Sequence, residues 1–221
     1  MILLVLMNII LIGPPGTGKG TMAKMIEEEF GYKHISAGDL LRDEVKKKSS
    51  LGKQAGPIMK AGKLVDDRLV AQIISSNVPK YAKTGFVLDG FPRNMKQARI
   101  LEGIFKKTKT GIDAVLLIET NDRKIVERLS SRRQCPKCHT IYGLNIPPKN
   151  DGKCDNDNAA LVLRDDDKAE VITKRLELYR QSAGELVEFY SKKMLVKKID
   201  GNMGPEKVFL QIKKAILGGG N

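Results

Sequence analysis

A glycine-rich loop near the N-terminus constrains the fold of this chain more than any other feature. The residues Gly13-Pro-Pro-Gly-Thr-Gly-Lys-Gly-Thr21 follow an apolar run that ends at Ile12 and precede a helical pattern. Glycines let the backbone fold back so that several N–H groups point into one concavity, and the next helix adds its positive N-terminal end. A plain Gly/Pro turn is the alternative, but Gly13, Gly18 and Lys19 stand at Walker spacing. The order of elements therefore predicts a polyphosphate-binding loop.

The loop departs from the usual motif at one position. Ser or Thr normally follows the lysine and its hydroxyl reaches magnesium, whereas this chain has Gly20 there and Thr21 one residue later. Lys19, at the start of the helix, is expected to reach the β- and γ-phosphates as a compact charge. We therefore predict a normal phosphate cradle with a displaced hydroxyl.

Composition limits the class of protein. The chain has 221 residues, of which 41% are hydrophobic and 29% charged, and no apolar run approaches the roughly 20 residues that span a bilayer. Residues 1–6 lack the basic start of a secretory signal and are interpreted as an extended first strand. The net charge of +13 suits polyanionic nucleotides. The aromatic content of 5% argues against a protein that binds single-stranded nucleic acid by stacking bases on aromatic side chains. We expect a cytoplasmic monomer without membrane or nucleic-acid partners.

Short apolar runs alternate with longer helical patterns along most of the chain. Runs that are apolar on both faces are typical of parallel strands covered by helices. We therefore predict an α/β fold of the P-loop NTPase-like type, a doubly wound parallel sheet whose ligands bind beyond the carboxyl ends of the strands. The strands are expected at residues 9–12, 86–88, 115–118 and 195–199, and the helices at 21–30, 94–105, 122–133, 167–192 and 205–217.

Two stretches interrupt this alternation and are interpreted as insertions. Residues 36–65 carry lysines and glycines between short helices, and residues 134–166 carry prolines, cysteines and asparagines without clear strands. The core is then formed by residues 1–35, 66–133 and 167–221. The phosphate loop and residues 89–93 both follow strands, so we expect them to face one another.

Several motifs together resemble adenylate kinases, a family of nucleoside monophosphate kinases. Gly13-Pro-Pro-Gly with Gly-Lys-Gly-Thr21, Ser36-Ala-Gly-Asp-Leu-Leu-Arg42, Gly62-Lys-Leu-Val65 and Phe86-Val-Leu-Asp-Gly-Phe-Pro-Arg93 carry the resemblance. It implies transfer of the ATP γ-phosphate to AMP, giving two ADP, with Mg²⁺ and a mobile lid formed by residues 134–166. Asp89 would orient magnesium-bound waters, and capping of the turn at Gly90 is its structural alternative.

The resemblance also implies an acceptor site. Arg42 and Arg93 would hold the AMP phosphate, a task that suits planar guanidinium groups. Gln97 would read the adenine edge, and Ala37 stands where the family usually has Thr. The residues assigned to AMP are Ala37, Arg42, Gly62, Lys63, Leu64, Val65, Gly90, Phe91, Pro92, Arg93, Gln97, Arg164 and Arg175.

Arginines flank the second insertion on both sides. Phosphoryl transfer spreads negative charge over several oxygens, which a catalyst must position and neutralise. The resemblance places the transferring phosphates near Arg132, Arg164 and Arg175, oriented by Asp166 and Asp167. The residues assigned to catalysis are Lys19, Asp89, Arg93, Arg132, Arg164 and Arg175. Those assigned to ATP are Gly16, Thr17, Gly18, Lys19, Gly20, Thr21, Arg128, Arg132, Tyr142 and Asn202.

The lid contains a metal-ligand pattern. Cys135-x-x-Cys138 is followed after fifteen residues (139–153) by Cys154-x-x-Asp157, and two such knuckles predict a four-ligand structural zinc site. The spacing leaves Asp157 and His139 as candidates for the fourth ligand. Lids of similar kinases favour Asp157, so the predicted Zn²⁺ ligands are Cys135, Cys138, Cys154 and Asp157.

Two alternatives remain at this point. A GTP-dependent AMP kinase or another nucleoside monophosphate kinase would share most of these motifs. A zinc-ribbon nucleic-acid protein that uses the loop as an ATPase would release phosphate without AMP, which distinguishes it from a kinase.

Overall fold

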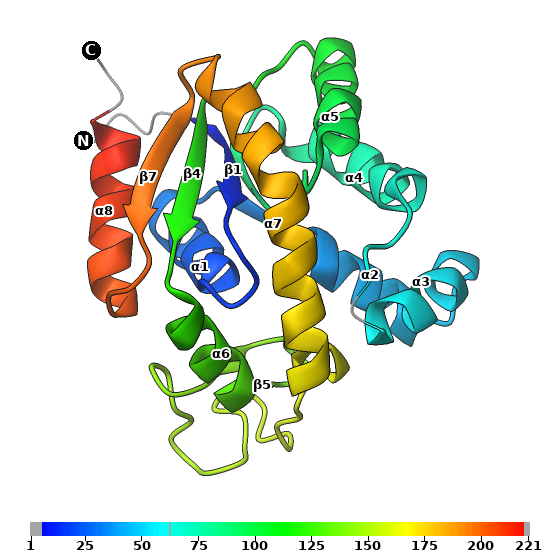
Figure 1. Cartoon of the computed structure of the whole chain (residues 1–221), viewed down its shortest axis with the longest axis vertical. Helices are drawn as coiled ribbons and strands as arrows, with labels where there is room; N and C mark the ends of the chain where they lie inside the picture. The colour runs from blue at the N-terminus through cyan, green and yellow to red at the C-terminus, as the bar shows by residue number, and fades with distance from the viewer. Residues whose placement is uncertain (1–5, 62, 219–221) are drawn as a thin grey trace.

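The core is a five-stranded parallel sheet. A computed structural model describes residues 6–61 and 63–218, and orders the strands β2-β3-β1-β4-β7 (Figure 1). β1 therefore lies in the middle, with the carboxyl ends of β3 and β4 beside its own. The strands are β1 (Asn8–Ile12), β2 (Lys33–Ser36), β3 (Phe86–Asp89), β4 (Ala114–Glu119) and β7 (Val196–Asp200).

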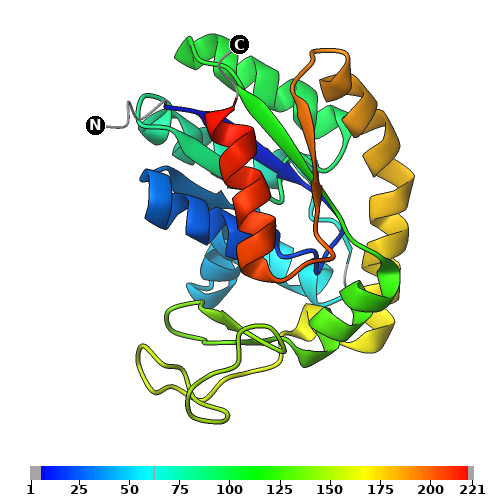
Figure 2. The same cartoon turned by 90° about the vertical axis from the view of Figure 1, so that its left-hand side faces the viewer.

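Alternating side chains of β1 enter two separate apolar layers. Ile9 and Leu11 pack with α1 (Lys19–Phe30) and α8 (Pro205–Leu217) on one face. Ile10 and Ile12 pack on the other face with α4 (Asp67–Tyr81), α5 (Met95–Thr108) and α7 (Ala169–Ser191). Figures 1 and 2 show these helices on the two sides of the sheet. Burial on both faces explains why β1, β3 and β4, the three inner strands, are apolar over most of their length.

Two segments extend beyond this layered core at the end where the phosphate loop lies. The first consists of α2 (Ala37–Lys46) and α3 (Ser50–Lys60). The second follows α6 (Asp122–Ser131) and contains a small antiparallel pair, β5 (Arg133–Gln134) and β6 (Ile141–Tyr142), before a 3₁₀ turn at Asp165–Asp167. Figure 2 shows this second segment as long loops next to α1 and α2.

The predicted doubly wound α/β fold is confirmed, with several differences in detail. The expected buried strand at residues 195–199 is the edge strand β7, in which only Ile199 is buried, and α5 extends to Thr108. The sequence analysis predicts neither β2, which is an edge strand with only Ile35 buried, nor α4. In α4, Val70, Ile74 and Val78 share one buried face, but Pro79 near the end of the helix obscures the pattern. The expectation that residues 134–166 lack strands is wrong because β6 pairs with β5 there. The sixth helix ends at Ser131 rather than at residue 133.

Some predictions lie outside the described residues. They are residues 1–5, most of the expected first-strand extension, and Gly62 of the acceptor site. Leu6, the last residue of that extension, is described and lies before β1. Among the described residues, no helix is both long and apolar enough to cross a membrane.

Candidate functional site

The phosphate loop joins β1 to α1 through residues with special backbone geometry. Gly16 and Gly18 have φ angles of 85° and 93°, in the left-handed region that glycine tolerates best. A Cβ on Gly13 would lie 2.6 Å from the carbonyl oxygen of Ile118, so only glycine fits there. The Lys19 ammonium curls back and donates hydrogen bonds of 2.8 Å to the carbonyl oxygens of Gly13 and Pro14. The loop therefore forms a preshaped concavity with a cation at its centre.

One large cavity opens from this loop and collects most of the predicted site residues. Phe91 is fully buried and does not line it, and Asn202 also lies outside its lining. The predicted residues that line the cavity are Gly16, Thr17, Gly18, Lys19, Gly20, Thr21, Ala37, Arg42, Lys63, Leu64, Val65, Asp89, Gly90, Pro92, Arg93, Gln97, Arg128, Arg132, Tyr142, Arg164 and Arg175.

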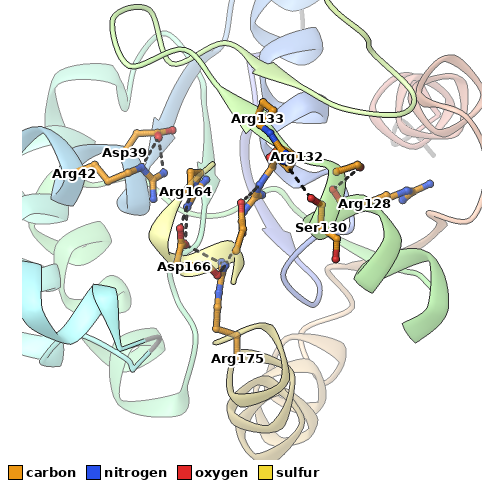
Figure 3. A network of polar contacts seen from close by, with 11 residues as sticks. Asp39, Arg42, Arg128, Ser130, Arg132, Arg133, Arg164, Asp166 and Arg175 are labelled. Carbon is orange, nitrogen blue, oxygen red and sulfur yellow. Dashed lines mark hydrogen bonds and ion pairs between the residues drawn. The ribbon is translucent and has the colours of Figure 1, made fainter. Parts of the chain in front are cut away.

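A network of arginines and aspartates forms one wall of the cavity (Figure 3). Arg132 donates from Nε to Asp167 Oδ2 over 2.6 Å, and the Asp167 side chain is completely buried. Arg164 forms a two-pronged pair with Asp166, with bonds of 2.9 and 2.7 Å. Arg175 donates to the Asp166 carbonyl oxygen over 2.8 Å and to Asp167 Oδ1 over 3.2 Å. The acidic pair thus holds three arginines from separate elements at fixed positions.

A second part of the cavity lining comes from the first insertion and from the turn after β3. Arg42 pairs with Asp39 one turn earlier in α2, with 3.2 Å between Arg42 Nε and Asp39 Oδ1. Arg93 donates from Nε to the Gly90 carbonyl oxygen over 2.9 Å and remains exposed to the cavity. The expectation that the phosphate loop and residues 89–93 face one another agrees with their shared place in this lining.

Charges crowded into the cavity change the pKa values of its groups. Burial, reinforced by Arg93, Arg175 and Arg132, lowers the pKa of Lys19 to about 8. Burial by itself raises the pKa of Asp89, but the neighbouring His34 and Lys19 outweigh it and the net shift is downward. Asp89 is therefore ionised beside Lys19, and the surplus of arginine makes the cavity suited to a multiply charged anion.

The predicted metal ligands lie together in the lid. Single ligand atoms of Cys135, Cys138, Cys154 and Asp157 all fall within 4.8 Å of one another. The Cys138 and Cys154 sulfurs are 3.4 Å apart, and Cys135 Sγ lies 3.2 Å from Asp157 Oδ2. His139, the rival ligand, instead points its Nε2 at Asp43 of α2 over 3.2 Å. Three thiols and one carboxylate fit a tetrahedral zinc site without an open position.

Comparison with known proteins identifies the family. A family model described as adenylate kinase matches residues 11–195. The chain belongs to the adenylate kinase family of phosphotransferases.

Similar proteins match nearly the whole chain. The adenylate kinase of Methanothrix thermoacetophila is 45% identical over 212 residues, covering 95% of this chain and 98% of that protein. That of Thermotoga maritima is 41% identical over 211 residues, covering 94% and 96%. That of a Hydrogenobaculum species is 42% identical over 213 residues, covering 95% and 100%. The resemblance inferred from the motifs is confirmed by these matches.

Arg128 and its neighbours form a further part of the cavity in this member of the adenylate kinase family. Arg128 donates to the carbonyl oxygens of Gly201 and Met203 over 2.9 and 3.1 Å, joining α6 to the turn before α8. The side chain of Asn202 turns away and binds the backbone N–H of Asn121. Tyr142 lines the cavity, while its hydroxyl accepts a 2.8 Å hydrogen bond from the Asp155 N–H inside the lid.

Sequence reasoning misses two polar residues next to this adenylate kinase site. His34, the second residue of β2, places Nε2 3.7 Å from Asp89 Oδ2. Asp67, at the start of α4, accepts a hydrogen bond from Gln97. Both lie on elements that the sequence analysis does not predict, so their proximity to the site is visible only after folding.

Proposed function

We propose that this protein transfers the γ-phosphate of ATP to AMP and so forms two ADP. The observation that carries the proposal is the single cavity that combines the phosphate loop with arginines on both sides. A donor polyphosphate would lie on the loop against Lys19, and the AMP phosphate would lie between Arg42 and Arg93. The donor and acceptor phosphates would then share one chamber, as direct in-line transfer requires.

The arginines would act on the charge that moves during transfer. Arg132, Arg164 and Arg175 line the cavity with side chains that are 15%, 10% and 16% exposed, so little water screens them. Asp166 and Asp167 position these guanidinium groups before substrate arrives, which reduces the reorganisation needed in the transition state. Lys19 can follow the transferring group as a point charge.

Magnesium would accompany the donor nucleotide. The ionised Asp89 carboxylate lies in the cavity near Gly20, where a Cβ would be 3.4 Å from Asp89 Oδ2. A carboxylate in that position suits a Mg²⁺ ion that keeps most of its water shell. Asp89 would orient the waters of such an ion, whose positive charge would offset that of the phosphates.

The lid would close over both nucleotides and exclude water that otherwise hydrolyses ATP. Lid contacts with the other insertion support this proposal. Lys46 Nζ of α2 donates to the Pro136 carbonyl oxygen over 3.3 Å, and Asp43 pairs with His139. A Zn²⁺ ion held by Cys135, Cys138, Cys154 and Asp157 would supply stability to the lid without touching phosphate.

The free thiols of the three cysteines support a cytoplasmic location. Cys135, Cys138 and Cys154 are free rather than disulfide-bonded, which fits a metal-binding role in the reducing cytoplasm. Nucleotides are the partners that the cavity chemistry favours, and we propose that the protein acts on them as a monomer.

A nucleotide panel tests the proposed function. ATP with AMP should yield ADP in a coupled assay, whereas GMP, CMP and UMP should be poor acceptors. Replacing Arg93 by Ala should weaken AMP binding and lower the rate, and Arg99→Ala, an exposed site on α5, is the matched control. Phosphate release without AMP would indicate an ATPase, and a preference for GTP would indicate the alternative donor.

A further inference from the structure

The side-chain amide of Gln97 is held in place before any nucleotide binds. Gln97 is only 2% exposed, although it lines the cavity. Its Oε1 accepts a 2.7 Å hydrogen bond from the backbone N–H of Arg93. Its Nε2 donates a 2.7 Å hydrogen bond to Asp67 Oδ1. Two short bonds therefore anchor the two ends of one amide.

These two partners permit only one orientation of the amide. A backbone N–H can only donate, and an ionised carboxylate can only accept. Rotating the Gln97 amide by 180° would put its oxygen against the Asp67 carboxylate and its nitrogen against the Arg93 N–H. Both contacts would then be repulsive, and a buried polar group left without a partner is costly. The amide consequently keeps one hydrogen and one oxygen lone pair available on defined sides.

Asp67 links two elements by more than one contact. Its Oδ1 also accepts a 3.1 Å hydrogen bond from Asn94 Nδ2. Asn94 in turn caps α5 by accepting a 2.8 Å hydrogen bond from the Gln97 backbone N–H. The Asp67 side chain is only 16% exposed and stands in the first turn of α4. One carboxylate thus fixes the start of α5 and the amide of its third residue.

We propose that Asp67 is a positioning residue that sets acceptor-base selectivity through Gln97, an inference that rests on the proposed AMP kinase function. The 6-aminopurine edge offers an amine donor beside a ring-nitrogen acceptor. The 6-oxopurine edge of IMP offers the reverse pattern, an oxygen acceptor beside an N–H donor. An amide locked in one orientation pairs with the first edge and leaves unpaired groups against the second. Without the Asp67 carboxylate, only the hydrogen bond from the Arg93 N–H still orients the Gln97 amide.

The experiment compares kcat/KM for AMP and for IMP in four proteins. In Asp67→Ala, the AMP:IMP ratio of kcat/KM should fall about tenfold, the factor that corresponds to one net hydrogen bond. The loss should appear mainly in the KM for AMP, with the KM for ATP unchanged. Asp67→Asn keeps an acceptor oxygen and should hold the ratio within about threefold of the wild type, since most of the bond survives.

A neighbouring carboxylate provides the matched control. Asp66 caps the same helix by accepting a hydrogen bond from the Arg68 N–H, without contact to Gln97. Asp66→Ala removes the same charge and should lower the melting temperature while leaving the AMP:IMP ratio unchanged. If Asp67→Ala does not fold, Asp67→Ser takes its place, because Ser is well tolerated at helix starts and is too short to reach the amide.

The possible results distinguish a failure of the positioning role of Asp67 from a failure of the proposed AMP kinase function. An unchanged ratio in folded Asp67→Ala or Asp67→Ser, or an equal loss in Asp67→Asn or Asp66→Ala, would overturn the positioning role. A wild-type protein that does not favour AMP over IMP would instead reject the proposed acceptor, before any variant is considered.

Discussion

The sheet core and the lid are held together by different physical means. The core buries two large apolar clusters on the two faces of its sheet. The lid buries only a small cluster around Cys135, Tyr142 and Cys154, while Leu144 is 59% exposed. Apolar burial is the main source of stability in a folded domain, so the lid lacks the source that the core has. A metal ion held by the clustered ligands would fill that role, because a metal bound only by the folded lid would stabilise it.

The arginine network lies where these two regions meet. Arg132 follows the last helix before the lid, and Arg164 stands at the lid's far end. Asp167 holds Arg132 and Asp166 holds Arg164, so the charges proposed for catalysis are anchored at the boundary and not among the predicted metal ligands. Under the proposed function, the chemistry would depend on the core and its boundary, and the stability of the lid would depend on bound metal. The following variants test that separation.

Lys19→Met should have the largest effect. Turnover should fall by at least about 10²-fold, because the lost charge acts on the transition state. The melting temperature should not fall, since the variant removes a poorly solvated ammonium group. A coupled ADP assay measures the turnover, and a thermal melt measures the melting temperature. Lys24→Met, at an exposed position on the same helix, is the control. Near-normal turnover would contradict the assigned role of Lys19.

Leu116→Ala should destabilise the whole core. Leu116 is fully buried in β4, and such truncations cost about 3 kcal/mol, or about 10 °C in melting temperature for a chain of this size. Leu144→Ala in the lid removes the same atoms from an exposed position and should change the melting temperature by less than about 2 °C. Similar losses in both variants would contradict the contrast between core and lid.

Chelation of zinc should loosen the lid selectively. The protein as purified should carry one zinc per chain, and its removal should make residues 134–166 sensitive to protease while the core fragment stays folded. Limited proteolysis with mass spectrometry measures this. Chelation should lower enzyme activity at mild temperature less than it lowers the resistance of residues 134–166 to protease. Metal analysis that finds no zinc in unchelated protein would remove the site.

Two variants within the lid identify the fourth ligand. Asp157→Ala should weaken zinc retention by at least about tenfold, because a ligand is lost. His139→Ala should change it little, since His139 faces Asp43 instead of the sulfurs. Competition with a chromogenic chelator compares the two. The opposite order would show that His139 is the ligand.

The pH dependence of ATP binding should be the smallest effect. The pKa of Lys19 is about 8 in the empty cavity, and polyphosphate should raise it toward the model-compound value. Binding then takes up a proton above pH 8, so affinity should fall as pH rises through 8, by at most about tenfold per unit. Isothermal titration calorimetry in buffers with different ionisation enthalpies detects this proton uptake. Zinc-free protein should show the same pH dependence, because Asp167 holds Arg132 at the boundary, and Lys19→Met should show none.

The sequence by itself determined the features that depend on local spacing. The phosphate loop needs glycines at positions set by the backbone, and the buried strands β1, β3 and β4 are recognisable as apolar runs between helical patterns. The metal knuckles are equally local, because each ligand pair comes from one short turn. For this reason Cys135, Cys138, Cys154 and Asp157 could be named together, and the structure brings them within 4.8 Å of one another.

Only the tertiary structure decided which distant residues meet. β2 buries one side chain and forms as an edge strand because β3 supplies its hydrogen-bond partners, so its sequence carries little signal. The pairing of Asp67 with Gln97 spans thirty positions and joins two helices. Arg128 reaches backbone carbonyls of the turn before α8, which no side-chain motif encodes. Such contacts depend on how helices pack over the sheet, and a one-dimensional pattern contains no information on that packing.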